Sequence, residues 1–192
     1  LARAGLRHAD LQLIAFGRGP GAFTGLRTAC AVAQGLAFGI GCPVLALDSL
    51  QIVAEDARAQ AGVDGGPFDI GVAMDARMDE AYAASYRFAG AGWEVVSPPG
   101  LYALDDLAAA WHGATVDAVA GSALRAFGDR VAWPGGARVE QEADRAAALL
   151  RVAGQLWAEG RAMPADQALP LYLRDKVALT TAEREARRAV VP

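Results

Sequence analysis

The chain has 192 residues, of which 54% are apolar and 21% are charged, and its formal net charge is −4. This composition excludes a disordered protein, and the acidic balance excludes a basic field that would hold nucleic acid by counterion release. No apolar run reaches the roughly 18 to 20 residues that span a bilayer, and no cleavable leader is recognisable, so we expect a cytoplasmic protein.

The first 61 residues alternate between strand and helix patterns, which is typical of an α/β lobe. Residues 1–7 resemble the end of a helix already under way, so we expect an N-terminally truncated lobe. The next elements are a strand at 11–16, a glycine loop, an apolar helix at 24–38, a strand at 43–47 and a helix capped by Asp48 or Ser49.

Residues 67–179 predict a second α/β lobe that opens with an antiparallel meander. Its expected elements are strands at 68–74, 80–88 and 93–96, a helix at 105–111, a strand at 116–120 and a helix at 143–159 that stops at Gly160. Residues 180–192 form a polar C-terminal tail.

The glycine loop Gly19, Pro20 and Gly21 lies between a strand and a helix, where backbone N–H groups can face an anion. A Walker loop needs a lysine here, and the chain has none before Lys176. The dinucleotide spacing is also absent, because the next glycine is Gly25. We therefore interpret the loop as structural, with a weak phosphate contact as the alternative.

Neither a catalytic residue nor a metal site is predicted. The two histidines, His8 and His112, belong to no metal-binding pair, and no serine stands in a nucleophile elbow. Ser122 is interpreted as a helix N-cap, and the acidic residues at 75, 79 and 80 as turn formers that Arg77 can pair with. Both cysteines are expected to be reduced.

Small residues recur every four positions along the helix at 24–38, at Gly25, Ala29 and Ala33. Such a stripe lets another helix approach closely, and it equally suits packing on the chain's own sheet. The spacing alone leaves both interpretations open.

The segment Gly17-Arg-Gly-Pro-Gly-Ala-Phe-Thr-Gly-Leu-Arg27 resembles the signature of the TsaB (YeaZ) family, with Ala22 in place of the usual serine. Three further segments fit in order: Asp75-Ala-Arg77, Gly121-Ser122, and the stretch from Leu169 to Arg184. The resemblance covers almost the whole chain.

This resemblance implies a two-lobed ASKHA (actin/Hsp70-like) fold and a non-catalytic subunit that pairs with the threonylcarbamoyltransferase TsaD and the ATPase TsaE. It implies that tRNA is reached only through the complex, that ATP or ADP has a place at the partner junction but not on this chain alone, and that a homodimer can form without TsaD. The implied partner interface comprises Phe23, Thr24, Gly25, Leu26, Arg27, Ala29, Cys30, Ala33 and Leu36. An ATP-dependent kinase or acyltransferase of the same fold, or an M22-type glycoprotease, remain the alternatives.

Overall fold

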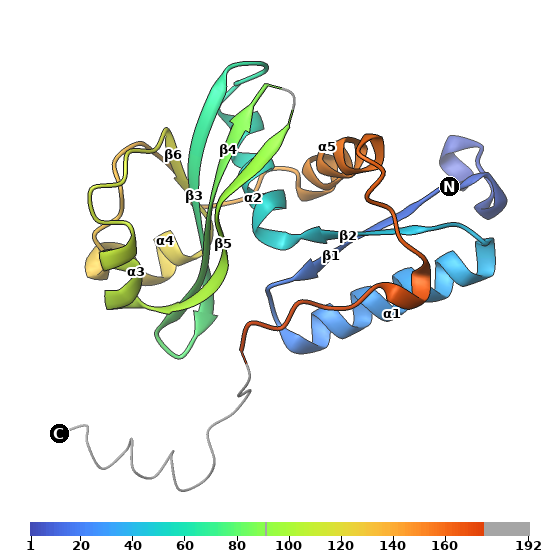
Figure 1. Ribbon diagram of the computed structural model, residues 1–192, viewed down its shortest axis with the longest axis horizontal. Coiled ribbons are helices and arrows are strands. Elements are labelled where there is room, and N and C mark those ends of the chain that lie inside the picture. The colour runs from blue at the N-terminus through green and yellow to red at the C-terminus, as the bar shows by residue number, and fades with distance from the viewer. Residues whose placement is uncertain (91, 175–192) are drawn as a thin grey trace, which may run out of the picture.

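The computed structural model describes residues 1–90 and 92–174, which form two β-sheets with helices on their faces (Figure 1). The first sheet pairs β1 (Ile14–Gly19) with β2 (Val44–Asp48) in parallel. The second has the order β5-β4-β3-β6-β7. Its strands are β3 (Pro67–Arg77), β4 (Glu80–Ala89), β5 (Trp93–Ala103), β6 (Ala118–Ala120) and β7 (Ala137–Val139).

The helices connect and cover these sheets. They are α1 (Phe23–Ile40), α2 (Ser49–Gln60), α3 (Leu104–Ala110), α4 (Ala123–Phe127) and α5 (Arg145–Ala158), with 3₁₀ turns at Ala2–Ala4, His8–Asp10, Gly128–Arg130 and Ala165–Gln167. Gly41 ends α1 in the left-handed conformation with φ of 78°, which glycine adopts without strain. No helix in the described part of the chain has the length and apolar character that a membrane crossing requires.

The two-stranded sheet lies between α1 on one face and α2 with α5 on the other (Figure 1). Phe16 and Val44 pack toward α1, whereas Leu45 and Leu47 belong to the core beneath α2 and α5. Because both faces are covered, β1 and β2 read as continuous apolar runs and not as alternating ones.

Around β3 the five-stranded sheet is also covered on both faces. Ile70 and Val72 of β3 point toward α2, and Ala73 of the same strand points toward α3 and α4. Gly71 allows Trp111 to lie against the strand, since a Cβ there would be 3.2 Å from the indole ring. Strand alternation therefore divides the second lobe's core into two layers.

The helices α2 and α5 join the two lobes into one core. The α2 helix contacts β1 and β2 as well as β3 and β4, and α5 contacts α2 and both strands of the first sheet. The sequence assigned α5 to the second lobe, but in space its apolar face covers the first.

Most predicted elements are present, with several corrections. Residues 1–7 do not continue an α-helix, because a 3₁₀ turn is followed by left-handed Gly5 and extended Arg7. Strand β1 starts later than predicted and includes Gly17 and Gly19. Strand β5 continues through two prolines to Ala103, which an edge strand tolerates because one row of its N–H groups has no partner.

Strand β7 was not predicted, because three residues are too short for a periodic pattern, and α4 was anticipated only through Ser122 as a helix N-cap. The predicted tail, residues 180–192, lies outside the described residues.

Candidate functional site

The glycine loop turns the chain from β1 into α1. Gly19 has φ of 122°, and its N–H donates a hydrogen bond of 3.1 Å to Ser49 Oγ. The peptide bond between Gly19 and Pro20 is cis. A Cβ on Gly19 would lie 2.6 Å from the carbonyl oxygen of Leu171, so no other residue fits there without displacing that backbone. Gly21 has no positive φ and ordinary space for a Cβ, 3.6 Å from Leu26. The strict glycine position is Gly19.

The predicted interface residues of α1 lie on different sides of the helix. Leu26, Cys30 and Ala33 are buried within this chain, so in this structure their side chains offer no surface to a partner. Ala29 is half-buried against the same core, and Phe23 is half-buried beside Tyr172. The outward members are Thr24, Gly25, Arg27 and Leu36.

The rest of the outward face of α1 was not predicted from the sequence. Val32 is 55% exposed and Phe38 is 64% exposed. A Cβ added at Gly35 or at Gly39 would have no atom within 4 Å, so the helix surface is open at both glycines. An all-round apolar helix gives no sequence signal for which arc meets the sheet, because hydrophobicity is similar on every side.

A segment of the same chain covers part of α1. Residues 163–174, which we call the strap, run beside this helix in Figure 1 toward the second sheet. Ala165 and Ala168 of the strap are buried against Cys30 and Ala33. The small side chains predicted to admit another helix therefore admit the strap.

Two stacked aromatic rings and an arginine lie at the end of the strap near the glycine loop. The rings of Phe23 and Tyr172 stack with centroids 4.8 Å apart, and the Arg27 guanidinium lies 5.7 Å and 5.9 Å from the two centroids. Arg27 Nε also donates to Tyr172 Oη at 3.2 Å. The stack attaches the strap to the first turn of α1.

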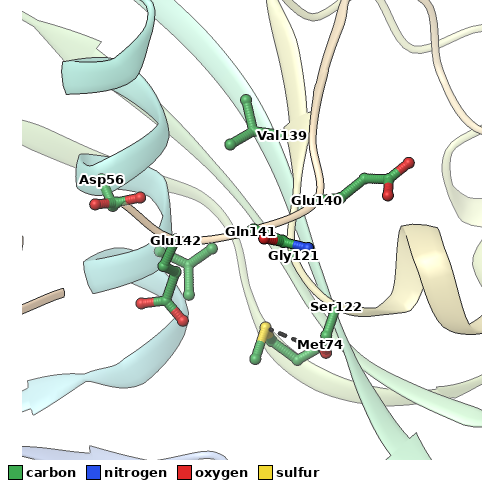
Figure 2. A pocket seen from close by; sticks show the side chains of 9 residues that line it. Asp56, Met74, Gly121, Ser122, Val139, Glu140, Gln141 and Glu142 are labelled. Carbon is green, nitrogen blue, oxygen red and sulfur yellow. Dashed lines mark hydrogen bonds between the residues drawn. The ribbon is translucent and has the colours of Figure 1, made fainter. Parts of the chain in front are cut away.

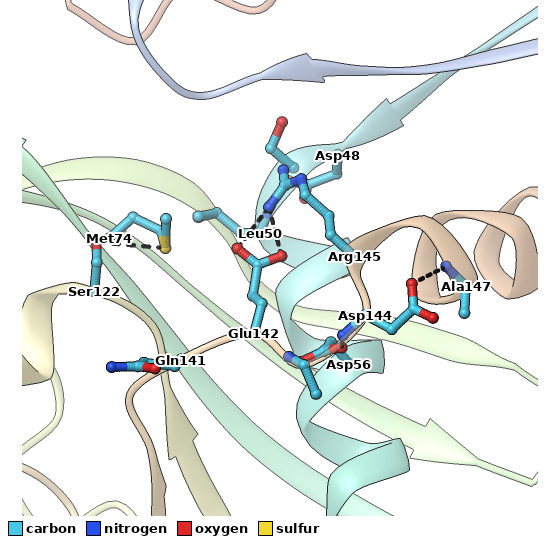
Figure 3. Close-up of polar contacts among 12 residues, drawn as sticks. Asp48, Leu50, Asp56, Met74, Ser122, Gln141, Glu142, Asp144, Arg145 and Ala147 are labelled. Atoms are coloured by element: carbon cyan, nitrogen blue, oxygen red, sulfur yellow. Dashed lines mark hydrogen bonds and ion pairs between the residues drawn. The ribbon is translucent and has the colours of Figure 1, made fainter.

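The cleft between the sheets contains a cavity of about 420 Å³ next to the glycine loop, lined also by Ser49, Met74 and Arg145. Arg145 is engaged by Glu142 at 2.7 Å, as the ion pair in Figure 3 shows. A phosphate in this cavity would have to compete with that carboxylate for the guanidinium. The lining residues do not include the lysine with which a Walker loop contacts phosphate.

A smaller cavity of about 50 Å³ also has Met74 in its lining, together with residues of α2, of β7 and of the segment that follows β7 (Figure 2). Ser122 beside it occupies the N-cap position of α4, but its hydroxyl makes no cap bond. Instead Ser122 Oγ accepts from the N–H of Asp75 at 3.1 Å and lies 3.7 Å from Met74 Sδ. The predicted capping role of Ser122 is wrong, and its hydroxyl instead joins α4 to β3.

The acidic residues of the β3–β4 turn are paired. Asp75 contacts Arg77 at 3.1 Å, as predicted, and Asp79 contacts Arg130 at 3.0 Å. Glu80 contacts Arg174 of the strap at 2.6 Å. These pairs give the turn a structural explanation.

Two carboxylates are withdrawn from solvent at helix α2, Asp48 partly buried at its N-terminus and Glu55 fully buried within it. The Asp48 side chain caps α2 through the N–H of Leu50 at 2.9 Å and accepts from Tyr86 Oη at 2.5 Å. Burial raises the pKa of Asp48 even though these hydrogen bonds oppose the shift. Glu55 is 2% exposed; burial alone would raise its pKa, but hydrogen bonds from Arg58, Arg151 and Trp93 lower it overall.

Among residues 1–90 and 92–174, no group of three His, Cys, Asp or Glu side chains gathers as metal ligands would. Cys30 and Cys42 are both free thiols, and Cys30 Sγ lies 3.3 Å from the carbonyl oxygen of Ala168.

Comparison with known proteins identifies the family. Residues 1–162 match the family described as tRNA N6-adenosine threonylcarbamoyltransferase (TsaD). The chain is 31% identical to the Escherichia coli K12 tRNA threonylcarbamoyladenosine biosynthesis protein TsaB, over 93% of this chain and 77% of that protein. The chain belongs to the TsaB family.

Other TsaB-family proteins agree with this assignment. The Bacillus subtilis TsaB is 32% identical over 46% of this chain and 36% of its own length. Two solved Pseudomonas aeruginosa structures superpose with TM-scores of 0.79 and 0.78 at 36% identity, covering 90% of this chain and 78% and 79% of theirs. One is described as YeaZ and the other as similar to the peptidase YeaZ.

The predicted fold class is thereby confirmed: the chain has the mixed α/β ASKHA-like fold of the TsaB family. The order strand, helix, strand, helix of β1 to α2 recurs in β6 to α5, with a parallel strand pair each time. This repeat is consistent with two related lobes.

Proposed function

We propose that the chain acts in threonylcarbamoyladenosine biosynthesis as a non-catalytic subunit that pairs with a TsaD-type chain through the outward face of α1. The observation that carries the proposal is the exposed apolar surface of this 18-residue helix. Val32, Leu36 and Phe38 are 55%, 42% and 64% exposed on it, and Gly35 has open space beyond its Cα. Exposed apolar side chains grouped on one helix are typical of a protein interface.

The glycines favour a helix as the partner element. Where a helix surface carries Gly35 and Gly39, a second helix can approach closely, because no Cβ separates the backbones. The outward arc also includes Thr24 and Thr28, so small side chains line this face along most of the helix.

A TsaD-type chain suits this surface because residues 1–162 of this chain themselves match the TsaD family. Two chains of one fold can pair about a pseudo-twofold axis that brings equivalent helices together, as in an isologous dimer. The same geometry permits a homodimer of this chain when TsaD is absent. In this proposal TsaE joins the pair, tRNA contacts the complex and not this chain alone, and ATP or ADP binds only where the partner supplies the phosphate ligands.

A matched pair of substitutions tests the proposal. Val32→Asp on α1 and Val96→Asp on β5 place the same charge at positions that are 55% and 59% exposed. We expect Val32→Asp to weaken TsaD binding by roughly tenfold or more, equivalent to about 1.4 kcal/mol, and Val96→Asp to leave it unchanged. Binding is measured by calorimetry with the TsaD of the same organism, and tRNA modification by the reconstituted proteins.

Both variants should keep the melting temperature of the parent chain, since each side chain points to solvent. Normal TsaD binding by Val32→Asp would place the interface elsewhere. ATP hydrolysis by the purified chain without partners would contradict the non-catalytic part of the proposal.

A further inference from the structure

The strap, residues 163–174, connects the two lobes on the side of α1 (Figure 1). It begins at β2, where Met163 and Val44 exchange two backbone hydrogen bonds of 2.9 Å. It ends at the β3–β4 turn of the second sheet, where Arg174 is held. One short segment therefore contacts both sheets.

Polar contacts hold the strap to α1. The Gln34 amide donates to the carbonyl oxygens of Ala165 and Ala168 at 3.0 Å and 3.1 Å. The Cys30 thiol donates to the Ala168 oxygen at 3.3 Å, and the Leu171 N–H donates to the Arg18 oxygen at 2.7 Å. The Cys30 side chain is covered on this side by the strap, which leaves the residue 5% exposed.

Arg174 holds the far end of the strap in place through its guanidinium, and its side chain is 11% exposed. It contacts Glu80 at 2.6 Å and donates to the carbonyl oxygens of Ala76 at 2.9 Å and Arg77 at 3.3 Å. Arg77, Met78 and Asp79 have φ of 67°, 60° and 59°. The backbone oxygens of this turn and the Glu80 carboxylate face the guanidinium, so the Arg174 side chain has several hydrogen-bond acceptors within reach.

The strap buries few large apolar side chains, since Met163 and Leu173 pack only partly buried against the core. Its most buried side chains are those of Ala165 and Ala168, whereas Leu169 is 69% exposed and Tyr172 is 40% exposed. Apart from one 3₁₀ turn and one bridge to β2, it belongs to no helix or sheet. Segments with few buried apolar contacts open at a lower free energy than the core beneath them.

We propose that the strap is a releasable cover over α1 and that Arg174 is the latch that holds it closed. When Arg174 leaves Glu80 and the turn, the strap separates from α1 and exposes the helix arc that carries Cys30 and Ala33. The device couples the two lobes, because a change at the β3–β4 turn alters the exposure of α1 in the first lobe. It concerns this chain alone and does not depend on the proposed TsaD partner.

Cys30 reports directly on strap opening. The chain has two cysteines, so Cys42→Ser leaves the thiol beneath the strap as the single reactive group. Burial also raises the pKa of Cys30, which keeps the thiol unreactive while the strap is closed. In this background we expect Arg174→Ala to accelerate labelling of Cys30 by a thiol reagent by roughly tenfold or more under native conditions.

The matched control is Arg130→Ala. Arg130 pairs with Asp79 of the same turn at 3.0 Å but has no contact with the strap, so its removal should leave Cys30 labelling unchanged. If Arg174→Ala does not fold, Glu80→Gln removes the ion pair while keeping the side-chain shape, and it should accelerate labelling in the same direction. Arg174→Lys should restore part of the protection.

Hydrogen exchange separates strap release from unfolding of α1. We expect Arg174→Ala or Glu80→Gln to speed exchange of the Leu171 amide, which bonds to Arg18, and to leave the Gly41 amide at the end of α1 protected. Unchanged Cys30 labelling in both latch variants would overturn the proposal. It would also fail if the Leu171 and Gly41 amides exchange together, since the strap would then open only when the helix unfolds.

Discussion

Substitution of Gly19 by alanine is the sharpest stability test that the glycine loop offers. The backbone φ of 122° lies in a region that costs a residue with a side chain about 1 to 3 kcal/mol. The new Cβ would also lie 2.6 Å from the Leu171 oxygen and 3.0 Å from Leu26 Cδ1. The first of these neighbours is backbone and cannot move without shifting the strap.

Strain and overlap together should lower the free energy of unfolding by about 2 to 5 kcal/mol. At about 3 °C per kcal/mol for a chain of this size, the melting temperature should fall by roughly 6 to 15 °C. Urea and thermal unfolding followed by circular dichroism measure both quantities. Gly21→Ala is the matched control, because that position lacks a positive φ and its Cβ would sit 3.6 Å from Leu26.

We expect Gly21→Ala to change stability by less than about 1 kcal/mol. A loss below 1 kcal/mol for Gly19→Ala, or equal losses for the two variants, would refute the assignment of the strict glycine to position 19.

Four further variants test the two sides of α1 and the carboxylates of Glu55 and Asp48. Ala33→Arg should unfold the chain, because an unpaired charge in the core costs several kcal/mol of the free energy of unfolding. Gly35→Arg should leave the monomer folded, because a side chain at this position meets open space. Circular dichroism distinguishes the two outcomes. The pKa of Glu55 is lowered by folding, so its contribution to stability is present above its unfolded pKa near 4.5 and lost as pH falls; Glu55→Gln should flatten that rise with pH. Folding raises the pKa of Asp48, so its contribution declines as pH rises through the raised value, and Asp48→Asn should instead make the overall rise steeper. Denaturant titrations between about pH 3 and 7 measure the slope of stability against pH for the parent chain and for each variant. Changes of slope in the same direction for Glu55→Gln and Asp48→Asn would contradict the assignment.

Local sequence patterns were sufficient for most of the fold. Apolar periodicity located α1 and α5, and Asp48 was correctly predicted as a candidate N-cap of α2. The glycine-loop signature was specific enough to indicate the TsaB family, which the relatives confirm. These features succeed because helix periodicity, capping and a tight strand-to-helix turn depend on neighbours a few residues apart.

The side of α1 that faces outward could not be predicted, because its residues are apolar or small all round. The sequence alone determined that a small-residue helix follows a glycine turn in an α/β lobe of the TsaB family. Only the tertiary structure decided that Ala33 faces inward beneath the strap, that Val32 faces outward, and that Gly19 is the position without room for a side chain. The reason is that Ala165 packs in the same core as Ala33 and the Leu171 oxygen lies against Gly19, each from more than 100 residues away, and no local pattern encodes such contacts.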